Sequence, residues 1–179
     1  MVNRAYRAGI IGCGSILRRH IEAMEGNSGF ALVSLCDTQE DILQAATSKY
    51  NVRGYKDYRE MINSENLNFV VIATPNGSHA EQSIYCLNND CDILIEKPVA
   101  LDPNDVLQIK RVAEQKQKTA YCVLQVRLNP AVKALKAVLD RGLLGTIRGI
   151  SLVQRWQRPV EYFTGWRSIA LIGGGTLYE

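Results

Sequence analysis

The stretch Arg7-Ala-Gly-Ile-Ile-Gly-Cys-Gly-Ser-Ile-Leu-Arg-Arg-His20 decides how the rest of the chain is interpreted. It begins as an apolar run, turns at two closely spaced glycines and continues with apolar residues at helical spacing. This order predicts a buried strand, a tight turn and a helix, which together bind phosphate in dinucleotide-binding folds. Gly12 would allow the tight turn. Gly14 would let a pyrophosphate approach the backbone, facing the free N–H groups near Ser15.

The glycine pattern is incomplete, because Leu17 occupies the third glycine position of G-x-G-x-x-G. An ordinary strand–turn–helix with two glycines is therefore an alternative. The next apolar run, residues 31–36, favours the dinucleotide site because it ends at Asp37, roughly 20 residues beyond the glycines. An acidic residue there would bind a ribose diol and repel a 2′-phosphate, which favours NAD over NADP. Asp37 is also a candidate N-cap for the following helix.

Strands and helices alternate along the first 125 residues. Further strands are expected at 53–55, 68–74, 92–96 and 119–124, and helices at 39–50, 58–62, 78–88 and from 102 onward. This alternation predicts an α/β fold, a doubly wound parallel sheet of the Rossmann type, and we interpret residues 1–125 as an NAD-binding domain.

The pattern changes after residue 125. A helix is expected at 129–141, and residues 146–156 then alternate apolar and polar side chains, as in a strand with one solvated face. Residues 126–179 are therefore interpreted as the start of a second, mostly antiparallel α+β domain. A single strand of this kind is not stable alone, so we expect a truncated chain or one that borrows strands from a partner.

The composition of the chain argues against several classes of function. Of the 179 residues, 46% are hydrophobic and 22% charged, as in soluble globular proteins. A net charge of +3 with scattered basic residues argues against nucleic acid. No apolar run suits a membrane span or a signal peptide. The five cysteines lack a C-x-x-C pair, and the histidines lack a metal-ligand pattern, so we expect no metal and buried thiols in a reducing cytoplasm.

Ligands of a doubly wound sheet bind beyond the carboxyl ends of its strands. The strand ends expected there are Gly12, Asp37, Thr74-Pro75-Asn76, Glu96-Lys97-Pro98 and Gln125. Lys97 would hydrogen-bond a substrate hydroxyl and stabilise the developing alkoxide. The alternative is a surface lysine paired with Glu96. His79 would contact the cofactor or, as we expect, hydrogen-bond loop backbone, and His20 would be a packed or substrate-side residue.

These motifs together resemble the glucose–fructose oxidoreductase/inositol dehydrogenase (Gfo/Idh/MocA) family. The matching pieces are Gly-Ile-Ile-Gly-Cys-Gly14, His20, Asp37, Ala-Thr-Pro-Asn76 with His79, Glu-Lys-Pro98, Trp166-Arg167 and Gly173-Gly-Gly175. Within the family, Arg19-His20, Leu-Gln-Val-Arg-Leu-Asn-Pro130 and the segment from Arg155 resemble the nucleotide-sugar branch. Members of that branch oxidise the 3-hydroxyl of UDP-N-acetylglucosamine or its uronic acid in surface-polysaccharide biosynthesis.

The resemblance implies an NAD-dependent dehydrogenase in which Lys97 is catalytic and, with Arg127, binds the substrate. It also implies that the domain begun by residues 126–179 is used for substrate and oligomer contacts. Glu179 corresponds to the acid or amide of the family's catalytic segment, where Asp or Asn is more usual. The implied cofactor-binding residues are Gly12, Cys13, Gly14, Ser15, Ile16, Asp37, Thr74, Pro75, Asn76, His79, Glu96, Lys97, Gln125, Trp166 and Arg167.

The family's acid/base histidine would follow Glu179 by four residues, beyond this sequence. We therefore expect residues 1–179 to bind NAD without detectable turnover and to self-associate through residues 146–156. The expected partners are a sugar or nucleotide-sugar substrate and a second copy of the chain. Two alternatives remain: an inositol-type polyol dehydrogenase of the same family, and a non-catalytic NAD-binding module.

Overall fold

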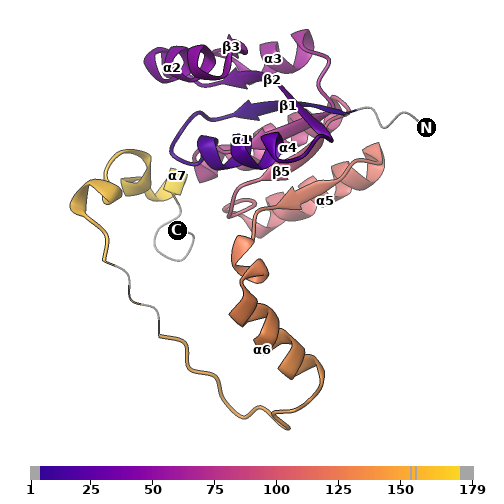
Figure 1. Ribbon diagram of the computed structural model, residues 1–179, viewed down its shortest axis with the longest axis vertical. Helices are drawn as coiled ribbons and strands as arrows, with labels where there is room; N and C mark the ends of the chain where they lie inside the picture. Colours follow the sequence, from indigo (N-terminus) through magenta and orange to yellow (C-terminus); the bar gives the residue numbers. More distant parts are fainter. Residues whose placement is uncertain (1–4, 154, 156, 174–179) are drawn as a thin grey trace.

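Six parallel strands form one sheet in the order β3-β2-β1-β4-β5-β6 (Figure 1). The computed structural model describes residues 5–153, 155 and 157–173. The strands are β1 (Tyr6–Ile11), β2 (Phe30–Cys36), β3 (Arg53–Tyr55), β4 (Phe69–Ile72), β5 (Asp92–Ile95) and β6 (Ala120–Cys122). The strand order reverses between β1 and β4, which confirms the predicted doubly wound sheet and places its ligand-binding crevice at their carboxyl ends.

Five helices cover the two faces of the sheet: α1 (Leu17–Glu25), α2 (Glu40–Tyr50), α3 (Tyr58–Ser64), α4 (His79–Asn88) and α5 (Pro103–Lys116). Two more, α6 (Pro130–Asp140) and α7 (Ala170–Gly173), follow the last strand. Short 3₁₀ turns are η1 (Asn76–Ser78), η2 (Gln125–Leu128), η3 (Val160–Phe163) and η4 (Gly165–Ser168). One apolar cluster joins the sheet to α1 and α2, and a second joins it to α3, α4 and α5.

The sequence explains this packing. Neighbouring residues of β1 enter opposite clusters, since Ile10 packs under α1 and Ile11 packs toward α4, and both are almost completely buried. Strands covered on both faces read as continuous apolar runs. At α5, the helix expected from residue 102, the Asp102 side chain accepts a hydrogen bond from the Asn104 N–H and Pro103 occupies the first turn.

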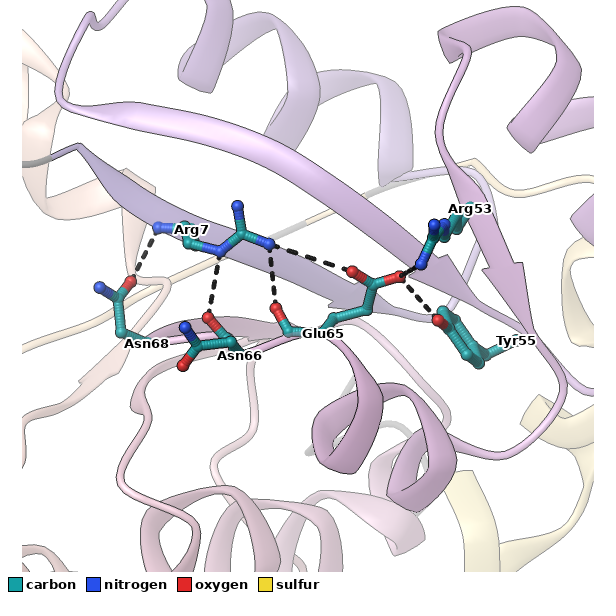
Figure 2. Close-up of polar contacts among 6 residues, drawn as sticks. All are labelled: Arg7, Arg53, Tyr55, Glu65, Asn66 and Asn68. Atoms are coloured by element: carbon teal, nitrogen blue, oxygen red, sulfur yellow. Dashed lines mark hydrogen bonds and ion pairs between the residues drawn. The ribbon is translucent and has the colours of Figure 1, made fainter.

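A polar cluster fastens the amino ends of β1 and β4 to the end of α3 (Figure 2). The buried Glu65 carboxylate accepts a 2.6 Å hydrogen bond from the Tyr55 hydroxyl and lies 3.4 Å from an Arg53 nitrogen. Arg7 donates to the Glu65 carbonyl, and its backbone N–H donates to Asn68. The hydrogen bond to Glu65 also raises the pKa of Tyr55. The cluster therefore ties the start of β1 and the loop before β4 to β3.

The chain after β6 leaves the sheet. Figure 1 shows α6 projecting away and the segment with α7 returning toward α1. The predicted helix at 129–141 is confirmed as α6, with Asn129 as its N-cap. The predicted strand at 146–156 is wrong for the residues that the structure describes, because 146–153 and 155 form no strand. A strand needs backbone partners, and no described segment pairs with this one.

Candidate active site at the carboxyl edge of the sheet

The loop between β1 and α1 is shaped by two glycines with different roles. Gly12 has φ = 100°, and a Cβ there would lie 2.5 Å from the Ala73 carbonyl oxygen. Its N–H donates to the Cys36 carbonyl at 2.8 Å. Around Gly14, by contrast, a Cβ would meet nothing within 4 Å. The first glycine is therefore required by the turn, and the second leaves space over the backbone where a ligand can approach.

The start of α1 suits an anion. Its N-cap, Ile16, makes no side-chain capping hydrogen bond, and the first turn contains no acidic residue. Backbone N–H groups at a helix start that lack side-chain caps bind phosphate, and the helix dipole favours negative charge there. Leu17, at the third glycine position, is 6% exposed and packs into the cluster beneath α1. The open space at Gly14 and this helix start therefore fit a pyrophosphate.

Asp37 fastens the glycine loop to the end of β2. One carboxylate oxygen accepts from the Cys13 N–H at 2.8 Å, and the other accepts from the Gln39 N–H at 2.9 Å. The N-cap of α2 is Gln39, so Asp37 does not have the alternative role of helix cap. Each carboxylate oxygen has a second acceptor site, which leaves Asp37 able to accept from ribose hydroxyls beside the glycine loop.

The thiol inside the glycine loop is protected. Burial, with the nearby Asp37 carboxylate, raises the pKa of Cys13 to about 12. Burial also raises the pKa of Cys36 to about 12, with further contributions from Cys13 and Asp37. Because the thiolate is the reactive form, these two side chains act as small apolar packing groups rather than as nucleophiles.

The loop after β4 is organised by His79. The His79 side chain is fully buried, with Nδ1 2.7 Å from the Pro98 carbonyl oxygen and Nε2 2.8 Å from the Thr74 carbonyl oxygen. This confirms the expected hydrogen bonding to loop backbone. The Thr74 hydroxyl donates to Gln82 Oε1 at 2.6 Å. Sequence reasoning missed Gln82, whose only signal was its position on α4 one turn beyond His79.

Asn76 connects this loop to the returning segment. Its side-chain Nδ2 donates to the Gly173 carbonyl at 2.8 Å, and the Asn76 side chain is buried. A Cβ on Gly173 would lie 3.2 Å from Arg167 backbone atoms, so glycine permits the close approach. The segment that carries Trp166 and Arg167 therefore contacts the loop after β4, which was predicted to bind the cofactor.

Lys97 is the second residue beyond the end of β5 and is partly exposed. The preceding Glu96 does not pair with Lys97 alone, because its Oε1 lies 2.9 Å from Nε2 of His20 on α1. Burial raises the pKa of Glu96, but the hydrogen bond and charge of His20, together with the backbone hydrogen bond and charge of Lys97, outweigh burial and hold the pKa of this carboxyl below its usual range. Glu96 is therefore an anion beside Lys97, and its partner His20 is an inward-facing residue of α1.

The remaining predicted residues occupy short turns. Gln125 and Arg127 lie exposed in η2. Burial and the Glu96 charge raise the pKa of Cys122, and the charge of Arg127 opposes this rise. Trp166 and Arg167 lie in η4, with the Arg167 guanidinium 4.4 Å from the Trp166 ring centroid. Glu179 lies outside the described residues, so its role stays a prediction.

In the part of the chain that the structure describes, His, Cys, Asp and Glu side chains form no group of three or more suited to a metal ion. None of its helices combines the length and the apolar character that crossing a membrane requires.

A parallel sheet in this order, with a glycine loop, an acidic residue after β2 and a helix start open to an anion, defines a dinucleotide-binding domain. More specifically, the chain belongs to the Gfo/Idh/MocA oxidoreductase family with an NAD-binding Rossmann fold, whose model matches residues 6–124. The family resemblance and its cofactor class are thereby confirmed.

Known relatives extend the comparison. The inositol 2-dehydrogenase of Salmonella typhimurium is 32% identical over 146 residues, which is 78% of this chain and 43% of the relative. The crystal structure of the WlbA dehydrogenase of Bordetella pertussis, in complex with NADH and UDP-GlcNAcA, is 29% identical and superposes with a TM-score of 0.94. That likeness covers 100% of this chain and 55% of WlbA. The chain thus spans about half the length of these relatives.

A third structure gives a contrast. The myo-inositol 2-dehydrogenase of Lactobacillus plantarum is 28% identical, with a TM-score of 0.73 over 80% of this chain and 43% of its own. The WlbA dehydrogenase of Chromobacterium violaceum is also 28% identical, but its TM-score is 0.85 over 96% of this chain. At similar identity, the two WlbA structures follow this chain further along its length than the inositol dehydrogenase does.

Proposed function

We propose that this chain belongs to an NAD-dependent dehydrogenase that oxidises a nucleotide sugar, at the 3-hydroxyl of a UDP-N-acetylhexosamine or its uronic acid. The observation that carries the proposal is the extent of the likeness. The Bordetella WlbA structure covers 100% of this chain, whereas the Lactobacillus plantarum inositol dehydrogenase covers 80%. The WlbA likeness therefore includes the segment after β6, with Arg127, Trp166 and Arg167, where the nucleotide-sugar branch was expected to differ.

The site supplies the parts that such a reaction needs. NAD, when bound, accepts the hydride from the sugar carbon. The helix start behind Gly14 would hold the pyrophosphate, and Asp37 would accept hydrogen bonds from the adenosine ribose. Trp166 and Arg167, on the segment anchored by Asn76, would close over the cofactor. Arg127 would bind the anionic part of the substrate.

Lys97 would act on the substrate hydroxyl. Its side chain leaves the chain at the carboxyl end of β5, where a doubly wound sheet binds its ligands. There the lysine would hydrogen-bond the hydroxyl oxygen and stabilise negative charge on it as the hydroxyl proton passes to the acid/base histidine that the family resemblance implies beyond Glu179. Glu179 would contribute to the same proton transfer in the whole protein. The Glu96 carboxylate, held by His20, would keep a negative charge beside the ammonium.

A polyol dehydrogenase of the same family is the second candidate. It is favoured by sequence identity, since the Salmonella inositol 2-dehydrogenase is 32% identical to this chain, whereas the Bordetella WlbA dehydrogenase is 29% identical. A non-catalytic NAD-binding module is the third, and it would retain the glycine loop and Asp37 while making no use of Lys97.

Reduction of NAD⁺ by the protein expressed from its complete reading frame tests the three candidates. UDP-GlcNAcA, UDP-GlcNAc and myo-inositol would be supplied separately. The proposal predicts NADH only with the nucleotide sugars, and Lys97→Met should lower kcat by roughly 10²- to 10⁴-fold with unchanged NADH affinity. Turnover of inositol alone would support the second candidate. NADH binding without turnover of any of the three would favour the module.

Self-association through a C-terminal sheet stays a prediction, as does a cytoplasmic location. The described part of residues 146–156 is not a strand, so association would have to use exposed apolar side chains, such as Ile150 and Leu152, which are 86% and 87% exposed. Sedimentation at several concentrations of the 179-residue chain tests this prediction, since a monomer at all concentrations would contradict it.

A further inference from the structure

The two histidines of the chain contact the two residues that flank Lys97. His20 lies 2.9 Å from the Glu96 carboxylate, and His79 lies 2.7 Å from the Pro98 carbonyl oxygen. They approach from opposite faces of the sheet, because α1 packs in one apolar cluster and α4 in the other. Neither histidine was assigned a role toward Lys97 by the sequence.

On one side of Lys97, Glu96 is held at three points. Its N–H donates to the Ile72 carbonyl at 2.9 Å, which ties it to β4. One carboxylate oxygen contacts His20, and the other accepts from the Lys97 N–H at 3.3 Å. Because Glu96 is an anion, the His20 Nε2–H donates in this pair. Both side chains are largely buried, at 9% and 15% exposure, so water competes little for this bond.

On the other side, His79 joins two loops. Its ring lies between the Pro98 carbonyl after β5 and the Thr74 carbonyl after β4. A neutral imidazole carries one N–H and both partners are carbonyl oxygens, so one of the two contacts is a hydrogen bond in the neutral ring. The ring is fully buried, which fixes its position by packing as well. Pro98 is therefore restrained by His79 at the start of α4, while Glu96 is restrained by His20 of α1.

We propose that His20 and His79 are positioning residues for Lys97, which they serve by fixing the residues before and after it. The catalytic part of this inference rests on the proposed function, in which Lys97 acts on the substrate hydroxyl. Lysine has a long, flexible side chain, and its ammonium is placed reproducibly only if the backbone from which it extends is fixed. The contacts of His20 and His79 restrain the backbone before and after Lys97 at the carboxyl edge of the sheet.

His20 offers the cleaner test, because its ring is at the edge of the core, whereas loss of the fully buried His79 ring risks loss of the fold. His20→Leu removes the donor and keeps an apolar side chain. His20→Gln keeps an N–H near the position of Nε2 and should still donate to Glu96. Met24→Leu is the matched control, because Met24 is 8% exposed and lies one turn further along the same buried face of α1.

The readout is the ¹³C signal of Lys97 in the reductively ¹³C-methylated 179-residue chain, identified by its absence in Lys97→Arg. In the wild type and in Met24→Leu, we expect a signal separate from those of the exposed lysines. His20→Leu should move it into their range, and His20→Gln should restore it. Circular dichroism would establish that each variant is folded.

Two results would overturn the inference. One is an unchanged Lys97 signal in folded His20→Leu. The other is a His20→Gln spectrum that matches His20→Leu, since a role in packing alone would not distinguish a donor from its absence. His79→Asn, which keeps a donor near the Nδ1 position, gives a second test: the Lys97 signal should stay closer to the wild type than in His79→Leu, and equal shifts in two folded variants would contradict the role of His79.

Turnover separates this inference from the proposed function. If the protein reduces NAD⁺ with a nucleotide sugar, His20→Leu should lower kcat by roughly 10- to 100-fold, with little change in the KM for NAD⁺. An unchanged kcat would overturn the positioning role while leaving the proposed function in place. If the wild type turns over no sugar, the proposed function fails, and the ¹³C signal still decides whether the histidines position Lys97.

Discussion

The sheet domain, residues 5–122, and the segment that follows, residues 124–173, use similar apolar residues with opposite results. In the sheet domain they fill two closed clusters, with residues such as Val70 and Leu87 fully buried. In the following segment, Leu135, Leu144 and Val160 remain more than half exposed. The difference teaches that apolar side chains form a core only where paired strands and covering helices enclose them.

Removing the same side chain from both regions should give the largest contrast. Leu87→Ala leaves a cavity between the sheet and α4 and should lower the free energy of unfolding by about 2–5 kcal/mol. Leu135→Ala, on the 54% exposed side chain in α6, should change it by less than about 0.5 kcal/mol. Urea unfolding followed by circular dichroism measures both. Equal losses would mean that α6 contributes to the same core.

Two glycines with positive φ give the next contrast. Gly12→Ala should cost about 3 kcal/mol or more, because a strained backbone is combined with a clash against the Ala73 carbonyl. Gly145→Ala has φ = 62° but open space around it, so only the left-handed backbone should cost about 1 kcal/mol. Thermal unfolding compares the two variants, and a Gly12→Ala protein as stable as Gly145→Ala would contradict the geometry of the loop.

High pH should weaken the sheet domain, which contains all five cysteines. The pKa of Cys13 and that of Cys36 are raised from 9.0 to about 12, so the folded domain keeps these thiols protonated where the unfolded chain loses the protons. The free energy of unfolding should therefore be unaffected by these groups below about pH 9 and fall as pH rises toward about 12.

Urea unfolding at a series of pH values measures this slope. Cys36→Ala is the control, because it removes one of the two groups and should make the decline shallower above about pH 9. A wild-type slope that matches the slope of the Cys36→Ala variant would show that Cys36 does not titrate in this way.

The smallest effect is expected at the contact between the two regions. Asn76→Ala removes the hydrogen bond to the Gly173 carbonyl and should cost about 1 kcal/mol. Its consequence should be local, with faster protease cleavage within residues 157–173 and no change in cleavage of the sheet domain. Asn63→Ala, at an exposed position of α3, is the control. Unchanged cleavage in Asn76→Ala would mean that the segment is held by other contacts.

The sequence predicted the sheet domain well, because buried parallel strands and capped helices have strong local signals. The glycine turn, the acidic residue after β2 and the start of α5 near residue 102 were all located from residues close in sequence. The strand expected at residues 146–156 failed for the opposite reason: alternation gives a strand one apolar face, but only a neighbouring backbone completes it. Local signals therefore predicted strands correctly only where the described residues also supply the neighbouring strands.

The candidate site was predicted in part. Its position at the carboxyl edge follows from the strand order, and the hydrogen bonding of His79 to loop backbone was expected. The contacts of His20 with Glu96 and of Asn76 with Gly173 were not, because each joins residues far apart in the chain that carry no mutual pattern. Such pairs become visible only once the fold brings their elements together.

The central claim is that the carboxyl edge of this sheet binds NAD and that Asp37 makes it prefer NAD over NADP. Calorimetric titration of the 179-residue chain with NADH and NADPH tests this claim most directly. NADH should bind more tightly than NADPH, because the Asp37 carboxylate accepts from a ribose diol and repels a 2′-phosphate. Asp37→Ala should weaken NADH more than NADPH. Equal or tighter binding of NADPH by the wild type would contradict the account.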